Sequence, residues 1–273
     1  MSDNRARQAL QALEEAAASN ECLSAYYAFH RALLQVLFRA RSDIGATLEL
    51  ADPPALQSRV AQGLPLISFA QLPVDETTFP ELASAVAELL KNYDADLEPQ
   101  SLPESPDEWY ALARRRFEEN QASSAAQPAA DEPSLAQMAV DLALRPYLEW
   151  AGERVLQHVE DRIWGRGYCP VCGGVPDFAT LDAKTGSRRL VCSRCSSQWS
   201  YSRLKCPFCD VADHSRIVYY PGDYSVYRLY VCRACMHYLK TIDLREVGSD
   251  VLLPVERVLT VAMDAAARAE GYT

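Results

Sequence analysis

Eight of the nine cysteines in this 273-residue chain lie between positions 169 and 235, in four C-x-x-C pairs: Cys169/Cys172, Cys192/Cys195, Cys206/Cys209 and Cys232/Cys235. Paired thiols at this spacing serve as reactive dithiols, as halves of disulfides, or as ligands of a metal ion. Which of these applies decides whether the protein is an enzyme, a secreted scaffold or a metal-stabilised binding module.

Metal ligation is the interpretation that the rest of the sequence favours. The N-terminal stretch "MSDNRARQALQALEEAAASN" has no apolar core of the kind found in signal peptides, so we expect a cytoplasmic protein. Stable disulfides are rare in that compartment. A redox dithiol usually comes as one C-x-x-C near a βαβ pattern, whereas this chain has four pairs and no such pattern.

The cysteine region is an internal duplication. Cys169 and Cys206 are 37 residues apart, and Cys192 and Cys232 are 40 apart, so the second copy has a hairpin three residues longer. Each copy consists of a C-x-x-C turn, which we call a knuckle, then a hairpin and a second knuckle. That order brings four thiolates to one tetrahedral metal, although interleaved pairing of the copies is the alternative. We therefore expect two metal ions, and a four-sulfur site suits iron and zinc alike.

The first knuckle of each copy carries residues suited to a tight turn. Pro170 fixes φ inside the first one, and Gly173 can adopt a positive φ. Asp210 takes the place of that glycine in the second copy and tolerates the same region. The second knuckles, "CSRC" and "CRAC", lack both Pro and Gly, so we expect them to be looser.

The remaining chain is predominantly helical, which predicts an α+β protein. Helical periodicity and capping signals indicate helices over 5–45 with a break at 19–20, over 78–93, over 105–120, and from 134 to 164 with a kink or a junction at Pro146. The expected organisation is a helical domain at 1–166 with a flexible loop near 121–134, a first metal module at 167–200, a second at 201–248, and a C-terminal helix at 249–273. Trp199 and Tyr201 in the connector are expected to pack between the modules.

The formal charge of −10 is unevenly distributed. Residues 165–245 hold twelve Lys and Arg against six Asp and Glu, a net +6, and the remainder is net −16. Two divalent metals with four thiolates each carry about −2 apiece, so most of the basic charge is counter-charge. This weakens a nucleic-acid-binding interpretation. Four arginines are expected to be exposed and to steer a partner: Arg188, Arg189, Arg194 and Arg203.

Several other residues are not expected to take part in a site. Cys22 lies in an apolar helical pattern and is interpreted as a buried small hydrophobe. His214 and His237 are not needed, because eight cysteines complete two sites. We find no pairing of a catalytic nucleophile with a base, and the most apolar run, 32–38, is too short to span a bilayer.

The cysteine region and its surroundings resemble the FdhE family of formate dehydrogenase accessory proteins. The segments that carry the resemblance are "RGYCPVCGGVPDF", "LVCSRCSSQWSYSRLKCPFCD", "VCRACMHYLKTID" and "AEGY". The resemblance implies a helical domain followed by two rubredoxin-like modules, with iron as the metal. It also implies a cytoplasmic role in the biogenesis of respiratory formate dehydrogenases, through contact with their catalytic subunit.

The residues themselves predict a non-enzymatic, metal-stabilised interaction protein without membrane insertion or nucleic-acid binding. Two other classes remain open at this stage. One is a rubredoxin-like electron carrier, which a reversible iron site would support. The other is a zinc-ribbon nucleic-acid binder, which a steep dependence of affinity on salt would support. The oligomeric state is left open.

Overall fold

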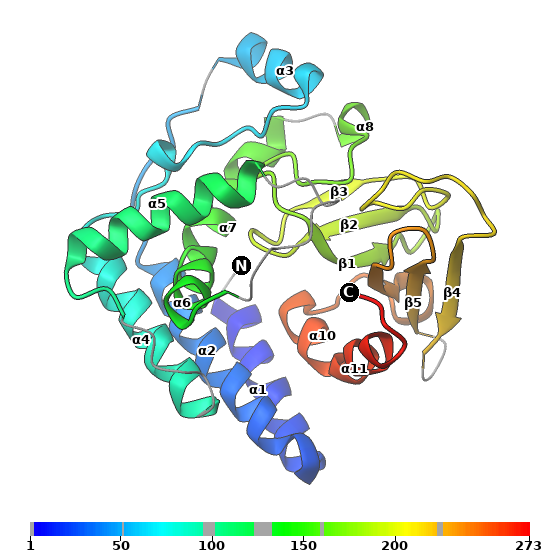
Figure 1. The fold of residues 1–273 in the computed structure, drawn as a ribbon, viewed down its shortest axis with the longest axis horizontal. Helices are drawn as coiled ribbons and strands as arrows, with labels where there is room; N and C mark the ends of the chain where they lie inside the picture. Colours follow the sequence, from blue (N-terminus) through cyan, green and yellow to red (C-terminus); the bar gives the residue numbers. More distant parts are fainter. Residues whose placement is uncertain (1–2, 51, 95–101, 123–132, 159–160, 223–225) are drawn as a thin grey trace. The chain divides into compact units, whose positions relative to one another are not determined.

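The computed structural model describes residues 3–50, 52–94, 102–122, 133–158, 161–222 and 226–273 (Figure 1). The chain divides into two compact units. The helical unit comprises Met1–Glu49, Ile67–Gln121 and Ala129–Ala151, and the cysteine unit comprises Leu50–Leu66, Ala122–Pro128 and Gly152–Thr273. The combination of a helical region with a six-stranded sheet confirms the predicted α+β class.

The helical unit is built from amphipathic helices whose alanine and leucine faces form its core. Helix α2 packs between α1 and α4, and α4 also packs against α6. The predicted break at 19–20 is present, because Asn20 accepts a hydrogen bond from the Leu23 backbone N–H and starts a new turn. The elements are α1 (Asp3–Ser19), η1 (Glu21–Leu23), α2 (Ser24–Ser42), η2 (Phe69–Gln71), α4 (Thr78–Tyr93), α5 (Pro106–Ala122), α6 (Leu135–Ala143) and α7 (Arg145–Val155), of which α7 continues into the cysteine unit.

Three expectations concern particular places in the helical region, and one of them is wrong. Helix α6 ends at Ala143 and α7 begins at Arg145, so two helices meet at Pro146 as predicted. Of the loop expected near 121–134, residues 123–132 lie outside the described part of the chain. Cys22 is exposed rather than buried, because it falls in η1 between two helices and not on the apolar stripe of α2.

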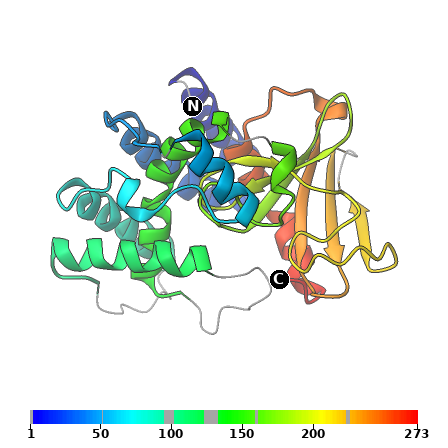
Figure 2. The same cartoon turned by 90° about the horizontal axis from the view of Figure 1, so that it is seen from above.

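In the cysteine unit, the two copies of the duplication share one six-stranded sheet. Each copy of the duplication forms three antiparallel strands, and a parallel pairing of β1 with β6 joins the copies in the order β3-β2-β1-β6-β5-β4. The strands are coloured from yellow-green to orange in Figure 2. The parallel pairing places Phe178 opposite Lys240 and Leu181 opposite Asp243. The strands are β1 (Pro176–Leu181), β2 (Arg188–Cys192), β3 (Gln198–Ser200), β4 (Ile217–Pro221), β5 (Tyr227–Cys232) and β6 (Tyr238–Asp243).

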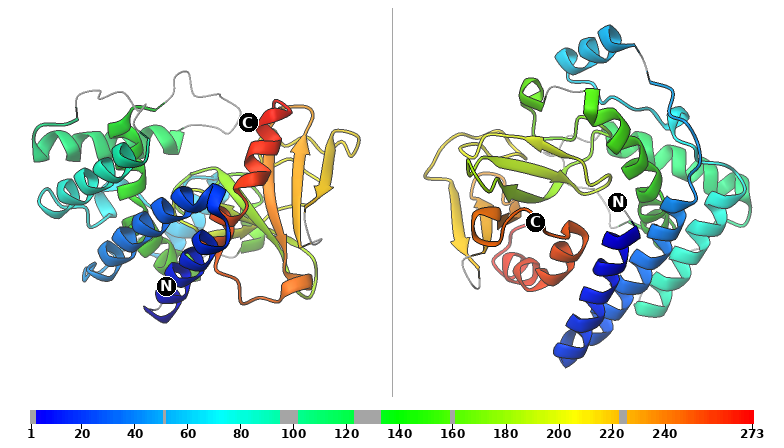
Figure 3. Two further views of the ribbon diagram at one scale, coloured as in Figure 1. Left: turned by 90° about the horizontal axis from the view of Figure 1, so that it is seen from below. Right: turned by 180° about the vertical axis from the view of Figure 1, so that it is seen from behind.

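Short helices complete the cysteine unit. The single helix expected at 249–273 is two helices that meet at Thr260, and both lie beside the sheet (Figure 3). Buried Lys240 of β6 fixes them there, because its Nζ donates to Asp264 at 2.6 Å and to the Arg257 carbonyl oxygen at 3.0 Å. The helices are α3 (Pro53–Gln62), η3 (Leu156–His158), α8 (Asp161–Trp164), α9 (Leu244–Val247), α10 (Leu253–Leu259) and α11 (Val261–Ala269).

The cysteine unit also includes residues 50–66 and 152–166, which the sequence analysis assigned to the helical domain. Within the described residues, no helix combines the length and the apolar character needed to cross a membrane.

Candidate metal centres

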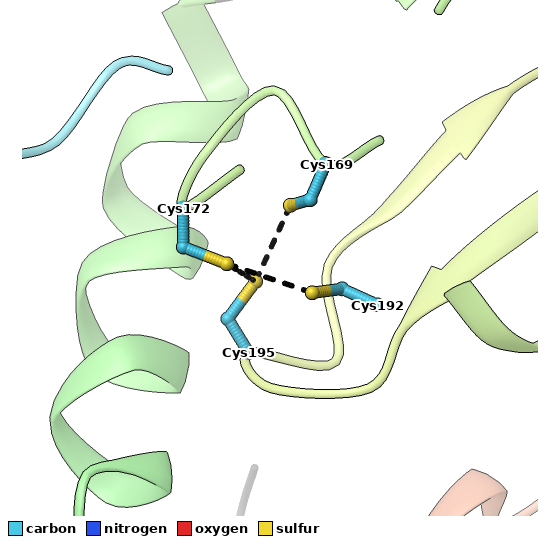
Figure 4. A group of neighbouring side chains, drawn as sticks. All are labelled: Cys169, Cys172, Cys192 and Cys195. Atoms are coloured by element: carbon cyan, nitrogen blue, oxygen red, sulfur yellow. Dashed lines mark hydrogen bonds between the residues drawn. The ribbon is translucent and has the colours of Figure 1, made fainter. Parts of the chain in front are cut away.

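The eight paired cysteines form two groups, one in each copy of the duplication. In each group, all four sulfur atoms lie within 4.8 Å of one another. The grouping is sequential rather than interleaved, because each hairpin brings its own two knuckles together. The first cluster is Cys169, Cys172, Cys192 and Cys195, whose side chains point toward one another in Figure 4. The second cluster is Cys206, Cys209, Cys232 and Cys235.

The distances between sulfur atoms fit a shared metal ion. In the first cluster, Cys169 and Cys195 are 3.5 Å apart and Cys172 and Cys192 are also 3.5 Å apart. Two pairs in the second cluster are 3.7 Å apart. A disulfide would need a separation of about 2.05 Å. A tetrahedral ion with metal–sulfur bonds of about 2.3 Å separates its ligands by about 3.8 Å, so the chain's own geometry suits such an ion.

All four knuckles adopt the same backbone turn. The residue directly after the second cysteine of each knuckle has a positive φ: 75° at Gly173, 54° at Ser196, 57° at Asp210 and 58° at Met236. The last three are the only non-glycine residues in the described chain with that geometry. The turn is therefore imposed by the hairpin and the cluster even where the local sequence does not favour it.

Hydrogen bonds close each knuckle in the same way. The N–H of the positive-φ residue donates to the carbonyl oxygen of the first cysteine, at 3.0 Å for Gly173 and 2.9 Å for Met236. The N–H of the first cysteine donates to a carbonyl five residues later, at 2.8 Å in the first knuckle and 2.9 Å in the others. The second knuckles have the same two hydrogen bonds as the first, although the one from Ser196 is the longest of its kind, at 3.2 Å. The expectation that the second knuckles are looser stays a prediction.

Three distant segments bury the first cluster. The Leu66 N–H donates to the carbonyl oxygens of Pro170, at 2.9 Å, and Val171, at 3.1 Å. The guanidinium of Arg257 on α10 donates to the Cys192 carbonyl oxygen at 2.6 Å. Gly152 on α7 approaches so closely that an added Cβ would lie 2.5 Å from the Ser197 hydroxyl. As a result, all four cysteines of this cluster are buried.

The second cluster is more open. Cys206 and Cys232 are buried, whereas Cys209 and Cys235, the second cysteine of each knuckle, are half-buried. Its two knuckles are joined by a stacking contact between Phe208 and His237, whose ring centroids are 4.7 Å apart. Two cysteines of this cluster therefore face a less shielded environment than any in the first.

The connector between the copies supports the second cluster. The Tyr201 hydroxyl lies 2.7 Å from Asp210 Oδ1 and 3.2 Å from the Cys206 carbonyl oxygen, so it holds the first knuckle of that cluster. Trp199 is fully buried and donates from Nε1 to the Arg166 carbonyl oxygen at 2.9 Å. Of the two aromatic residues in the connector, Tyr201 contacts both copies through Arg188 on one side and Cys206 on the other.

Burial and contacts between the cysteine side chains shift the pKa values of the thiols. Burial raises the pKa of Cys169 and of Cys195 well above the usual thiol range, whereas hydrogen bonds from the neighbouring thiols hold the pKa of Cys172 well below it. Burial also raises the pKa of Cys206, and raises that of Cys235 to about 12. Each cluster therefore retains protons that a bound cation would displace, so metal binding would release protons.

The four arginines that we expected to be exposed are not free surface charges. Arg188 is only 2% exposed, and Arg189, Arg194 and Arg203 are half-buried. The expectation failed because these residues use their guanidinium groups to bind carbonyl oxygens of a knuckle, the connector and the turn between β1 and β2, which residue type alone does not reveal.

The two histidines near the clusters are not in either group of sulfur ligands. His214 is exposed, and His237 Nδ1 lies 2.9 Å from the Cys235 carbonyl oxygen. Sequence reasoning missed Leu66 and Arg257 and gave Arg188 a different role, because no motif marks a residue that reaches a knuckle from a distant segment.

Comparisons with known proteins agree with this architecture. The model described as "FdhE, central domain" matches residues 168–203, which contain the first cluster. A protein FdhE homolog from Aquifex aeolicus is 33% identical over 133 residues, which cover 47% of this chain and 46% of the relative. One from Pseudomonas aeruginosa is 30% identical over 116 residues, which cover 39% and 37%. The aligned part therefore spans less than half the length of each relative.

The fold is shared over a longer stretch. The crystal structure of the FdhE protein from Pseudomonas aeruginosa matches 98% of this chain and 91% of that chain, with a TM-score of 0.60 and 20% identity. That likeness concerns the fold, whereas the family model matches residues 168–203 in sequence. The family model, the curated relatives and the solved structure all point to similarity with FdhE proteins: the family model over residues 168–203, the relatives over less than half of the chain, and the solved structure in fold.

Proposed function

We propose that this protein is a cytoplasmic accessory protein for the assembly of respiratory formate dehydrogenase, and that it binds the catalytic subunit of that enzyme. The observation that carries the proposal is the pair of four-cysteine clusters in a chain that is similar to FdhE proteins. The segments that contain these clusters are also those on which the resemblance to formate dehydrogenase accessory proteins rests.

Each cluster would hold one metal ion through its four thiolates. Iron is the metal that the resemblance implies, and zinc is the alternative that the same four-sulfur set accommodates. An ion bound in this way contributes on the order of 10 kcal/mol to folding, because the unfolded chain has no preformed site for it. The metal would supply structural stability to the sheet that connects both copies.

A structural role for the metals favours a binding protein over an enzyme. Catalytic metal sites keep one coordination position open for water or substrate, whereas a set of four cysteines fills a tetrahedral ion. The described part of the chain offers four sulfur atoms at each site, within 4.8 Å of one another. We therefore assign the function to surfaces of the folded protein rather than to chemistry at the clusters.

An electron carrier is the second candidate, and one observation favours it. Cys209 and Cys235 of the second cluster are half-buried, so an ion there would lie near the protein surface. The visible spectrum and reduction potential of anaerobically purified protein distinguish the candidates. Reversible cycling of one iron at a physiological potential would favour the carrier.

The test of the main proposal combines metal analysis with co-purification. The wild-type chain should contain about two equivalents of metal and should co-purify with the formate dehydrogenase catalytic subunit from cells that make both. Deleting the gene should abolish respiratory formate oxidation and leave unrelated molybdoenzymes active. Normal formate oxidation in the deletion strain, together with no association, would contradict the proposal. A strongly salt-dependent affinity for DNA or RNA would instead indicate nucleic-acid binding.

A further inference from the structure

Arg188 is a buried cation without a carboxylate partner in the described part of the chain. It lies on β2, in the first copy of the duplication, and is 2% exposed. Its guanidinium donates to the carbonyl oxygens of Ser202 and, at 2.6 Å, Lys205. The same group lies 5.4 Å from the centre of the Tyr201 ring. Its Nε has no hydrogen-bond partner among the described residues.

An isolated charge in such a place is unfavourable unless an anion compensates it. Desolvating a cation costs several kcal/mol, and carbonyl dipoles recover only part of that. Burial lowers the pKa of Arg188 to about 10, which still leaves the guanidinium protonated at neutral pH. The neighbouring Arg203 adds a second positive charge and makes the environment less favourable still.

The candidate for the compensating anion is the second cluster with its metal bound. Arg188 lines the same small cavity as Cys206 and Cys232, two of the four cysteines of that cluster. Four thiolates around a divalent ion carry a net charge of about −2. The two carbonyl groups that Arg188 binds also belong to the segment that leads directly into Cys206, so its contacts fix where that knuckle begins.

We propose that Arg188 is the buried counter-charge of the second cluster and its positioning residue, so that a strand of the first copy sets the metal affinity of the second. This inference rests on the proposed binding of metal by the second cluster. It assigns to the first copy a role that neither its motif nor its own cysteines indicate.

Two guanidinium groups approach the first cluster, and both differ from Arg188 in their surroundings. Arg194 donates to the Cys172 carbonyl oxygen at 3.4 Å and is half-buried rather than buried. Arg257 donates to the Cys192 carbonyl oxygen and also pairs with Asp177, at 2.8 Å, so it has a carboxylate counter-charge. Removing the Arg188 charge should thus affect the second cluster selectively.

The experiment measures cobalt(II) affinity at each cluster in the full chain. Metal-free protein is titrated with cobalt(II) against a competing chelator, and alkylation of free thiols followed by mass spectrometry assigns each step to a cluster. The variants are Arg188→Met and Arg188→Gln, which remove the charge, and Arg188→Lys, which keeps it. Arg189→Met is the matched control, because Arg189 neighbours Arg188 on β2 and contacts the Gln198 carbonyl oxygen instead.

We expect Arg188→Met and Arg188→Gln to weaken cobalt(II) binding at the second cluster by about 10- to 100-fold, the usual effect of losing a group that supports metal ligands. Arg188→Lys should restore most of that affinity, and the first cluster should keep wild-type affinity in all four variants. If Arg188→Met does not fold, the comparison of the Lys and Gln variants decides between charge and hydrogen bonding.

Two outcomes would overturn the inference while leaving the proposed function intact: wild-type affinity at the second cluster in Arg188→Gln, or equal losses at both clusters. A Gln variant that outperforms the Lys variant would also overturn it, because hydrogen bonding rather than charge would then be responsible. A wild-type second cluster that binds no metal would instead refute the proposed function, and the inference with it.

Discussion

The two cysteine clusters share one backbone design but have different surroundings. Both consist of two knuckles with a positive-φ residue after the second cysteine, and both close these turns with the same hydrogen bonds. The first cluster is buried, whereas Cys209 and Cys235 of the second are half-buried. The duplication therefore fixed the ligand geometry, and the segments packed around each copy set its exposure.

The space around the knuckles also differs between the clusters, and it is tighter at the first one. The first knuckle of the first cluster is closed by the carbonyl of Gly174, and the corresponding residue of the second cluster is Val211. An added Cβ at Gly174 would lie 2.9 Å from the Arg194 side chain and 3.1 Å from Cys192 Sγ. The second cluster has room for a valine at this point, which shows how much more tightly the first is enclosed.

Loss of a metal ligand should have the largest effect and should separate the clusters. We expect Cys172→Ser and Cys209→Ser each to lower the metal content by one equivalent, with a loss of binding free energy on the order of 10 kcal/mol at the affected site. Cys172→Ser should also lower the thermal unfolding midpoint more, because its cluster lies within the core. Metal analysis and calorimetry measure both effects. Equal midpoints in the two variants would contradict the difference in burial.

Stability should be next most sensitive to changes where β1 pairs with β6 and joins the two copies. Asp243 of β6 is fully buried, and its carboxylate accepts from Arg228 at 2.5 Å and from Arg245 at 2.6 Å. Asp243→Asn should destabilise the protein by about 3 kcal/mol, because it leaves a buried ion pair incomplete. Urea unfolding at neutral pH measures this loss.

The same carboxylate predicts a dependence on pH. Its hydrogen bonds from Arg245 lower the pKa of Asp243 to about 2. The folded state therefore favours the ionised form, so this contribution is complete at neutral pH and disappears as the pH falls from about 4 to about 2. The stability difference between wild type and Asp243→Asn should shrink over that interval. A difference that does not change with pH would argue against the ion pair as its source.

Crowding at the first cluster can be tested at Gly174. Gly174→Ala should weaken metal retention at that cluster, at a cost of about 1–3 kcal/mol, because the added Cβ has no room. Val211→Ala at the corresponding position of the second cluster is the control, and it should keep both metals. Chelator-driven metal release measures the two variants side by side. Faster release from Val211→Ala than from Gly174→Ala would reverse the comparison.

Thiol accessibility should follow the difference in exposure. In metal-free protein, an alkylating reagent should modify Cys209 and Cys235 about tenfold faster than any cysteine of the first cluster, because reactivity requires access to the sulfur. Timed alkylation with peptide mapping measures each rate. Exposed Cys22 serves as the internal reference for an accessible thiol.

The smallest effect is expected at the turn residue of the last knuckle. Met236 is 40% exposed and has a φ of 58°, a conformation that costs a side chain about 1–2 kcal/mol and costs glycine little. Met236→Gly should therefore stabilise the metal-bound protein by about 0.5–1 kcal/mol after the extra flexibility of the unfolded chain is counted. Gly173→Ala, at the corresponding turn of the first cluster, should destabilise it. The unfolding midpoints of the two variants with metal bound test whether the first rises and the second falls relative to wild type.

The spacing of the cysteines was sufficient to predict the local design of the cysteine region. Four C-x-x-C pairs at repeated intervals indicated knuckles, hairpins and sequential grouping, because each of these depends on residues close together in the chain. The helix break at residues 19–20 and the junction at Pro146 were predicted for the same reason: a cap and a missing N–H act locally.

Only the tertiary structure decided what surrounds those turns. The parallel pairing of β1 with β6, the covering of the first cluster by Leu66 and Arg257, and the burial of Arg188 all join residues far apart in sequence. An arginine that binds a buried carbonyl has the same residue type as one in solvent, so composition could not distinguish them. The sequence thus determined two clusters of matching geometry, and long-range packing made one buried and left the other partly open.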